Sequence, residues 1–102
     1  MNSFSDEITS SLKVLPSNPG VYQFIDANGQ IIYIGKAKNL KNRVQSYFTS
    51  KHDHFKTKVL VQSIQKIEYI IVDTEADALL LENNLIKTHQ PKYNILLKDD
   101  KT

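Results

Sequence analysis

A β-hairpin signal near the start of the chain constrains the fold most. Two apolar runs, residues 21–25 and 30–35, flank a turn that contains Asn28 and Gly29. An Asn-Gly pair readily adopts the positive φ angles that a tight hairpin turn requires, so the two runs are predicted to pair as antiparallel strands. Regular alternation along the second run predicts two faces, one with Ile31 and Tyr33 and the other with Ile32 and Ile34.

Helical patterns follow the hairpin. Asn39 can cap a helix whose apolar residues recur at helical spacing, namely Leu40, Val44, Tyr47 and Phe48. Residues 56–65 predict a second helix, with inward apolar residues at Val59, Leu60 and Ile64. A long helix is predicted from Thr74, which can cap it together with Asp77, to about His89, because Pro91 cannot continue it.

Strand patterns complete the chain. The β-branched run 67–72 predicts a third strand, and residues 93–97 predict a further short one. The order describes an α/β fold, in which a small mixed or antiparallel β-sheet is flanked by helices.

The composition fits one domain that crosses no membrane. The chain has 102 residues, of which 40% are hydrophobic and 24% charged, enough for one modest core. It has no run of the roughly 18 apolar residues that a membrane span needs, and no signal-peptide pattern. The absence of cysteine excludes disulfides and thiolate metal sites, and these features predict a cytoplasmic protein. We expect a lead-in over residues 1–14, the domain over 15–97 and a charged tail over 98–102.

Positive charge is concentrated in one segment. Seven of the thirteen Lys and Arg residues lie between positions 36 and 58, namely Lys36, Lys38, Lys41, Arg43, Lys51, Lys56 and Lys58. Such a segment suits a phosphate backbone. A solvated, lysine-rich helix face is the other interpretation.

Glu82 interrupts the apolar stripe of the last predicted helix. Its neighbours one turn away are Ala78, Leu79, Leu85 and Ile86. A lone carboxylate is costly to remove from water unless it is paired or binds a cation. Three interpretations remain: a place at the edge of the stripe, an ion pair with a lysine, or a metal ligand.

Arg43 is the only arginine beside twelve lysines. Lysine serves elsewhere as a generic positive charge, so Arg43 indicates a need for a planar, bidentate donor such as a phosphate accepts. It lies one helical turn before Tyr47, so the two side chains share a face.

Tyr22 and Tyr33 each belong to one arm of the hairpin, where tyrosines ordinarily pack across strands. Tyr33 is followed by Gly35, which would let another backbone or a phosphate approach closely, and by Lys36.

Other common site chemistries lack their residues. His52 and His54 are two positions apart in a predicted loop, which is not the spacing of a helical zinc pair. The sequence has no glycine-rich phosphate loop and no serine in a nucleophile-elbow sequence.

Several blocks of residues resemble the GIY-YIG nucleases. Gly20-Val21-Tyr22, followed after ten residues by Tyr33-Ile34-Gly35, is similar to the family signature, with valine in place of isoleucine. Further blocks resemble, within that family, the N-terminal domain of UvrC, the excision nuclease subunit of bacterial nucleotide excision repair: residues 15–22, 32–37, 40, 43–44, 46–48, 82–87 and 91–94. The resemblance covers nearly the whole chain. It implies a protein several times longer, so we interpret the chain as a domain truncated after its tail.

The resemblance implies a role for each candidate residue. Tyr33 activates or positions the attacking water, and Tyr22 lines the site. Arg43 neutralises the scissile phosphate, and Glu82 binds one divalent metal ion, Mg²⁺ or Mn²⁺. Three residues support the site, namely Lys36, Tyr47 and Asn94. The basic residues expected to contact DNA are Lys36, Lys38, Lys41 and Arg43.

The resemblance also implies the reaction and its partners. The reaction is the 3′ incision beside a lesion in double-stranded DNA, with UvrB and indirectly UvrA engaged through regions outside this chain, and with a monomeric isolated domain. Two alternatives stay open: a free-standing GIY-YIG nuclease acting on branched DNA, and a catalytically silent nucleic-acid-binding module. The presence of Tyr22, Tyr33, Arg43 and Glu82 disfavours the silent module.

Tyr33 poses a chemical question. A free phenol has a pKa of about 10, which nearby positive charge from Lys36, Arg43 and a metal would lower. The sequence leaves open whether Tyr33 ionises or only orients water.

Overall fold

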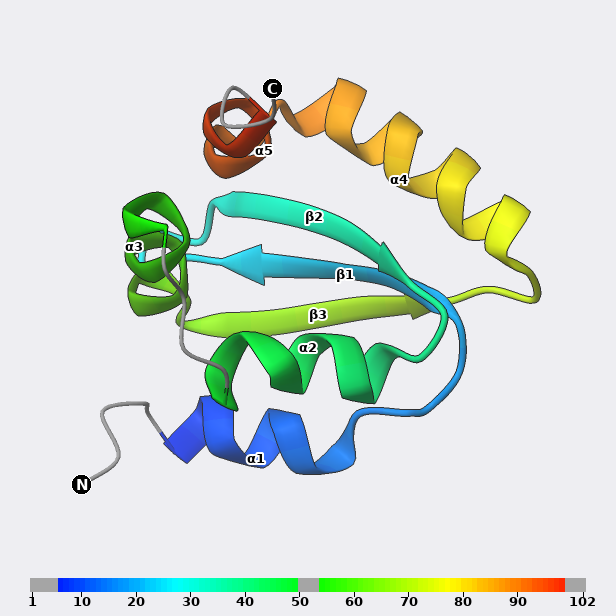
Figure 1. The fold of residues 1–102 in the computed structure, drawn as a ribbon, viewed down its shortest axis with the longest axis horizontal. Coiled ribbons are helices and arrows are strands. Elements are labelled where there is room, and N and C mark those ends of the chain that lie inside the picture. Colours follow the sequence, from blue (N-terminus) through cyan, green and yellow to red (C-terminus); the bar gives the residue numbers. More distant parts are fainter. Residues whose placement is uncertain (1–5, 50–53, 99–102) are drawn as a thin grey trace.

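A three-stranded antiparallel sheet forms the centre of the computed structural model, which describes residues 6–49 and 54–98 (Figure 1). The central strand β1 (Gly20–Ile25) pairs on one side with β2 (Ile31–Ala37) and on the other with β3 (Lys66–Ile71). The predicted fold class is confirmed, and the sheet is antiparallel, not mixed. Lys51, His52 and residues 99–102 lie outside the described residues.

Five helices surround the sheet in the described part of the chain (Figure 1). α1 (Asp6–Val14) lies beside β3 and α2 (Leu40–Thr49), and α2 packs on β1 and β2. α4 (Glu75–His89) packs along β2 and β1. α3 (Phe55–Ser63) contacts α5 (Lys92–Lys98), which lies beside β2. None of these helices is long and apolar enough to cross a membrane.

Two apolar clusters hold these layers together. The larger one joins β1 to α1, α2, α3 and α5, and its buried residues are Ile8, Leu15, Tyr22, Phe24, Ile32, Leu40, Val44, Leu60, Ile64, Ile67 and Tyr93. The smaller one packs α4 on the sheet through Val21, Ile34 and Ala78. The sheet thus fixes the positions of α2 and α4 relative to its edge strand β2.

A β-bulge changes the faces of β2. Phe24 pairs with Tyr33 but Ile25 pairs with Ile31, so Ile32 is the extra residue. Ile32 joins the larger cluster, against which Tyr33 also packs, while Ile31 packs against the smaller one. The predicted grouping of Ile31 with Tyr33 and of Ile32 with Ile34 is therefore wrong, because an inserted residue shifts the alternation by one.

The predicted helix caps are confirmed. The side chain of Asn39 accepts a hydrogen bond from the Asn42 N–H at 3.0 Å, and the Thr74 hydroxyl accepts one from the Asp77 N–H at 3.1 Å. α4 ends at His89 and is capped by Gln90, whose φ of 48° is left-handed.

The two ends of the domain differ from the expectation. The stretch expected as a lead-in contains α1, whose Ile8 is only 1% exposed and belongs to the core. Residues 93–97, predicted as a strand, form most of α5, so that prediction is wrong. The outer edge of β2, where a fourth strand could have paired, is instead bonded by a side chain of α5.

Candidate active site

Three tyrosines meet where the hairpin packs on α2. Tyr22 of β1 is 1% exposed, and its hydroxyl shares a 2.8 Å hydrogen bond with the hydroxyl of Tyr47. The ring of Tyr33 lies 6.3 Å from that of Tyr22 and 6.2 Å from that of Tyr47, centroid to centroid. The Arg43 guanidinium, one helical turn before Tyr47, lies close enough to Tyr22 to lower the pKa of its hydroxyl. The four side chains therefore form one polar cluster, called here the tyrosine cluster.

Gly35 makes room for this cluster. It lies directly opposite Tyr22 in the sheet, and a Cβ at position 35 would overlap the hydroxyl oxygen and ring of Tyr22. The expectation that a phosphate or another backbone approaches Gly35 is thus wrong. The side chain of Tyr22, from the neighbouring strand, fills this space.

Two side chains form hydrogen bonds with backbone groups on the outer edge of β2. Asn94 of α5 accepts from the Ile34 N–H and donates to the Ile34 carbonyl, both at 2.8 Å. One Glu82 carboxylate oxygen accepts from the Lys36 N–H at 3.1 Å. These contacts take the place of a β-ladder partner and fix the backbone on both sides of Gly35.

Glu82 reaches this edge from α4, where it is half-buried. No lysine side chain forms an ion pair with it within residues 6–49 and 54–98. The lysine-pair interpretation therefore loses its support, and the second carboxylate oxygen is left for another ligand.

Burial controls the protonation of the tyrosine cluster. Burial, and then the neighbouring Tyr33, raises the pKa of Tyr22 to about 12, although Tyr47 and Arg43 oppose the shift. The pKa of Tyr33 is raised by burial and by Tyr47, with a smaller contribution from the Glu82 carboxylate, while Arg43 lowers it. Burial likewise raises the pKa of Tyr47. The lowering expected from positive charge is present at Tyr33 through Arg43, but burial and Tyr47 outweigh it.

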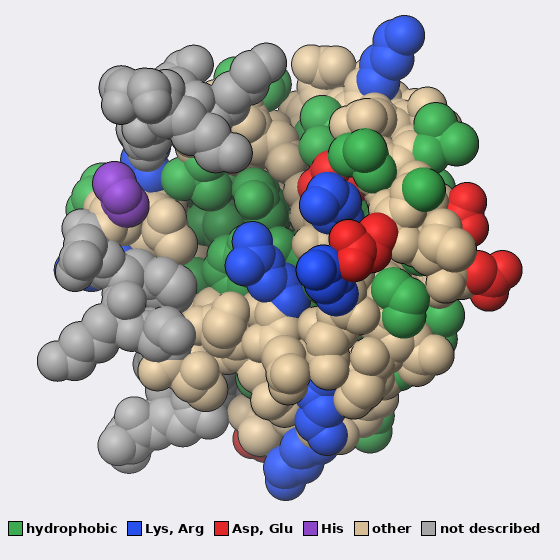
Figure 2. Space-filling view, turned by 45° about the vertical axis from the view of Figure 1, so that its right-hand side comes forward, with side chains coloured by type: hydrophobic (Ala, Val, Ile, Leu, Met, Phe, Trp, Pro, Cys, Tyr) green, Lys and Arg blue, Asp and Glu red, His purple; other side chains and the backbone are tan. Residues whose placement is uncertain are grey.

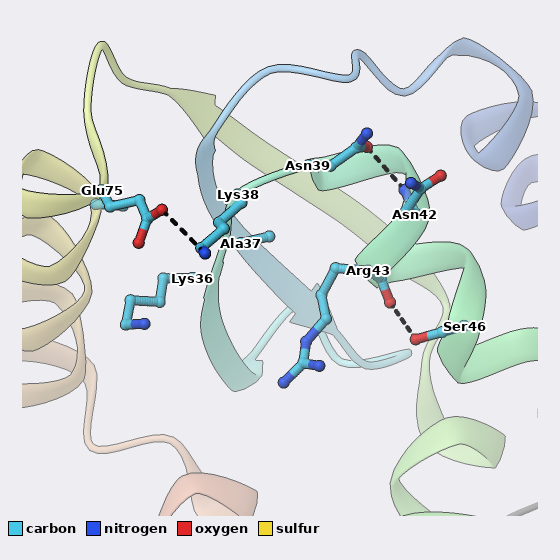
Figure 3. A pocket seen from close by; sticks show the side chains of 9 residues that line it. Lys36, Ala37, Lys38, Asn39, Asn42, Arg43, Ser46 and Glu75 are labelled. Carbon is cyan, nitrogen blue, oxygen red and sulfur yellow. Dashed lines mark hydrogen bonds and ion pairs between the residues drawn. The ribbon is translucent and has the colours of Figure 1, made fainter.

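A pocket of about 460 Å³ opens beside the tyrosine cluster, between the end of β2 and the first turns of α2 and α4 (Figure 3). Its lining residues are Lys36, Ala37, Lys38, Asn39, Asn42, Arg43, Ser46, Glu75 and Ala78. Lys36 and Arg43 belong both to this pocket and to the surroundings of the cluster. Basic side chains gather on this face next to acidic ones (Figure 2). Lys41 is half-buried on α2 and does not line the pocket.

Residues 18–95 match the model of the UvrC-like GIY-YIG domain. The chain belongs to this family. It is 66% identical over 91 residues to UvrABC system protein C of Flavobacterium psychrophilum and 58% identical over 97 residues to that of Porphyromonas gingivalis strain W83. These matches cover 89% and 95% of this chain but only 15% and 16% of the two relatives. The chain thus spans a small part of the curated relatives it matches.

Solved GIY-YIG structures share the fold. The GIY-YIG N-terminal endonuclease domain of UvrC from Thermotoga maritima, bound to its catalytic magnesium, matches with a TM-score of 0.78 and 39% identity over 88% of this chain and 98% of that one. Variants of the same domain with a single tyrosine-to-phenylalanine or asparagine-to-alanine change also hold the catalytic divalent cation. The predicted divalent cofactor agrees with these relatives.

Glu82 fits a role as the metal ligand of this GIY-YIG domain. Among the described residues, no three His, Asp or Glu side chains gather to enclose an ion. A half-buried carboxylate with one oxygen held by a backbone N–H and the other unbonded in the described contacts suits Mg²⁺, which usually keeps several waters. One carboxylate, with waters, is a shell that Mg²⁺ accepts.

The pocket beside the GIY-YIG site contains residues that the sequence did not single out, namely Asn42, Ser46 and Glu75. Asn42 and Ser46 lie on α2, one residue before and three after Arg43, which indicated only that they lie near it on the helix. Glu75 begins α4 and carried no signal of its own.

Proposed function

We propose that this chain is a divalent-metal-dependent endonuclease domain that hydrolyses a DNA phosphodiester, making the 3′ incision in nucleotide excision repair. The observation that carries the proposal is the position of Tyr33. Its ring packs against Tyr47, which lies one helical turn from Arg43 on α2, and Glu82 of α4 bonds the Lys36 N–H three residues farther along β2. A group that can handle water thus lies near both a cation suited to phosphate and a carboxylate suited to a metal ion.

Each residue contributes one task to hydrolysis. The Tyr33 phenol accepts a hydrogen bond from the attacking water and orients it, since burial keeps the phenol's own proton in place. The proton that the water loses passes to the solvent. The Arg43 guanidinium offers preorganised donors to the charge that develops on the phosphate. Tyr22 and Tyr47 share a hydrogen bond beside that guanidinium, and Asn94 holds the backbone next to Tyr33.

The metal held by Glu82 would supply Lewis-acid stabilisation of the leaving oxygen. Glu82 is aimed by the Lys36 N–H, so its orientation does not depend on a flexible side-chain partner.

The basic residues Lys36, Lys38 and Lys41 complete the proposal by attracting the DNA backbone. We further propose that the full-length protein acts on lesion-bearing duplex together with UvrB, and indirectly UvrA, through regions outside this chain, in the cytoplasm, and that the isolated domain is a monomer. The UvrC-like match and the much greater length of the relatives favour this function over a free-standing nuclease. The intact cluster of Tyr22, Tyr33, Arg43 and Glu82 argues against a silent binding module.

The test is Tyr33→Phe in the full-length protein, assayed with its repair partners on lesion-bearing duplex. Losing the hydroxyl that orients the water should lower 3′ incision by about 10²-fold, the typical cost of misplacing a reacting group by about 1 Å. Tyr69→Phe is the matched control, because Tyr69 is a 39% exposed tyrosine on β3 and lies outside the tyrosine cluster.

DNA already nicked on the 3′ side gives a second control. The 5′ cut on this substrate should survive in Tyr33→Phe. Undiminished 3′ cutting would remove Tyr33 from the mechanism, whereas loss of both cuts would show a folding or assembly defect.

A further inference from the structure

The pocket beside the tyrosine cluster contains one acidic residue that the proposed chemistry does not use. Three cations line it, namely Lys36, Lys38 and Arg43, together with a single carboxylate, that of Glu75. Glu75 begins α4 and faces Lys38 across the mouth of the pocket, with 3.4 Å between the Lys38 ammonium nitrogen and the carboxylate oxygen (Figure 3). A carboxylate repels a polyanion such as DNA, so the place of Glu75 in this pocket needs an explanation.

The ion pair is weak enough to open. The Lys38 and Glu75 side chains are 80% and 59% exposed, so water and salt screen their attraction. A DNA phosphate can therefore displace Glu75 from Lys38. The Asn42 side-chain amide lines the same space and has no hydrogen-bond partner among the described residues, so it is an additional available donor.

The pocket is adjacent to the scissile site and is not the same space. Arg43 and Lys36 border both, but no tyrosine and not Glu82 lines the pocket. Its volume, about 460 Å³, lies within the range of small-ligand pockets. A DNA strand extends on both sides of its scissile phosphate, so a strand that meets Arg43 can reach this pocket, which Arg43 also lines.

We propose, on the basis of the nuclease function above, that the pocket binds the phosphodiester next to the scissile one and that Glu75 competes with it for Lys38. Glu75 thereby limits the affinity of the domain for DNA in general. Tight binding then depends on a strand that also fills the scissile site.

The experiment is an NMR titration of the ¹⁵N-labelled domain with a short duplex, at about 0.1 M ionic strength, where charges more than about 10 Å apart are screened. Domains of this length fold alone, since this chain covers 98% of the solved Thermotoga maritima domain. In the wild type, the backbone amides of Lys38, Asn42 and Ser46 should shift. Inorganic phosphate at the same phosphate concentration should shift them less.

Glu75→Gln should tighten duplex binding by about two- to fivefold. The plot of log binding constant against log salt concentration should become steeper by up to about 0.9, the value for one further phosphate contact. Asp77→Asn is the matched control. It removes the same charge from the same helical turn, with the same effect on the helix dipole, but Asp77 does not line the pocket. Its affinity should stay close to that of the wild type.

Equal tightening by Glu75→Gln and Asp77→Asn would overturn the proposal, because only net charge would then matter. Unmoved pocket amides would overturn it too, as would equal binding of free phosphate and duplex. These outcomes leave the nuclease function intact if Glu82→Gln abolishes incision. Normal incision by Glu82→Gln would instead refute the nuclease mechanism, whatever the pocket binds.

Discussion

Asn94 offers the sharpest test of how the fold holds the site. Its amide makes two hydrogen bonds to the backbone of Ile34, next to Tyr33, and so closes the outer edge of β2. Asn94→Ala removes both. At about 0.5–1.5 kcal/mol each they contribute about 1–3 kcal/mol, and the better helix propensity of alanine offsets up to about 0.7 kcal/mol. We expect a net loss of about 1–2 kcal/mol, which for a domain of this size lowers Tm by about 4–16 °C.

The assay is thermal unfolding followed by circular dichroism. Asn84→Ala is the control, because Asn84 is an exposed helical asparagine with no hydrogen bond to its side chain among the described contacts. Its Tm should stay the same or rise slightly, since alanine is the better helix former.

Asn94→Asp separates the strand-edge role from a helix role. Asn94 is the third residue of α5, where a carboxylate would favour the helix dipole and raise Tm. In the strand-edge role the second carboxylate oxygen faces the Ile34 carbonyl, so Tm should fall. Either of two results would refute the reasoning. One is a rise in Tm for Asn94→Asp. The other is a fall of less than about 3 °C for Asn94→Ala, which is smaller than a loss of even 1 kcal/mol would produce.

Further predictions concern the catalytic groups. Glu82→Gln should abolish incision with little change in Tm, because the amide oxygen can still accept from the Lys36 N–H; an unfolded variant would make Glu82 structural. Arg43→Lys should lower incision by about 10²–10³-fold with a much smaller loss of DNA binding, and equal losses would make Arg43 an ordinary backbone contact. Gly35→Ala should cost about 1–3 kcal/mol in urea unfolding, because its methyl group overlaps Tyr22; wild-type stability would mean that Tyr22 has another position available. The folded pKa of Tyr22 is about 12, above the unfolded value of about 10, so stability is fully present below pH 10 and is lost as the pH rises toward 12, by about 3 kcal/mol for this group. Tm measured across this range should fall less in Tyr22→Phe than in the wild type, and parallel curves would contradict the assignment.

Local sequence signals predicted much of the fold. The turn at Asn28-Gly29 marked the hairpin, although only Gly29, and not Asn28, takes a positive φ. Asn39 and Thr74 marked the starts of α2 and α4. Each of these signals acts between residues a few positions apart, so no distant contact is needed to read it. The bulge at Ile32 was not predictable in this way, because one inserted residue leaves no periodic trace.

Residues 93–97 show where local reading fails. A short apolar run suits a strand or a buried helix equally well, and periodicity cannot separate the two. The tertiary structure decides in favour of α5, because there Tyr93 is buried in the core and Asn94 meets the open edge of β2.

The sequence by itself determined the chemistry available: one arginine, a carboxylate in an apolar stripe, and tyrosines on both arms of a hairpin. Only the tertiary structure decided how these groups act together. Glu82 bonds the backbone of Lys36 across 46 positions, and Asn94 bonds that of Ile34 across 60. Tyr22 fills the space above Gly35, which the sequence left open to a phosphate. Side-chain type is a property of single residues, whereas burial, hydrogen-bond partners and pKa depend on neighbours that only the packed chain brings together.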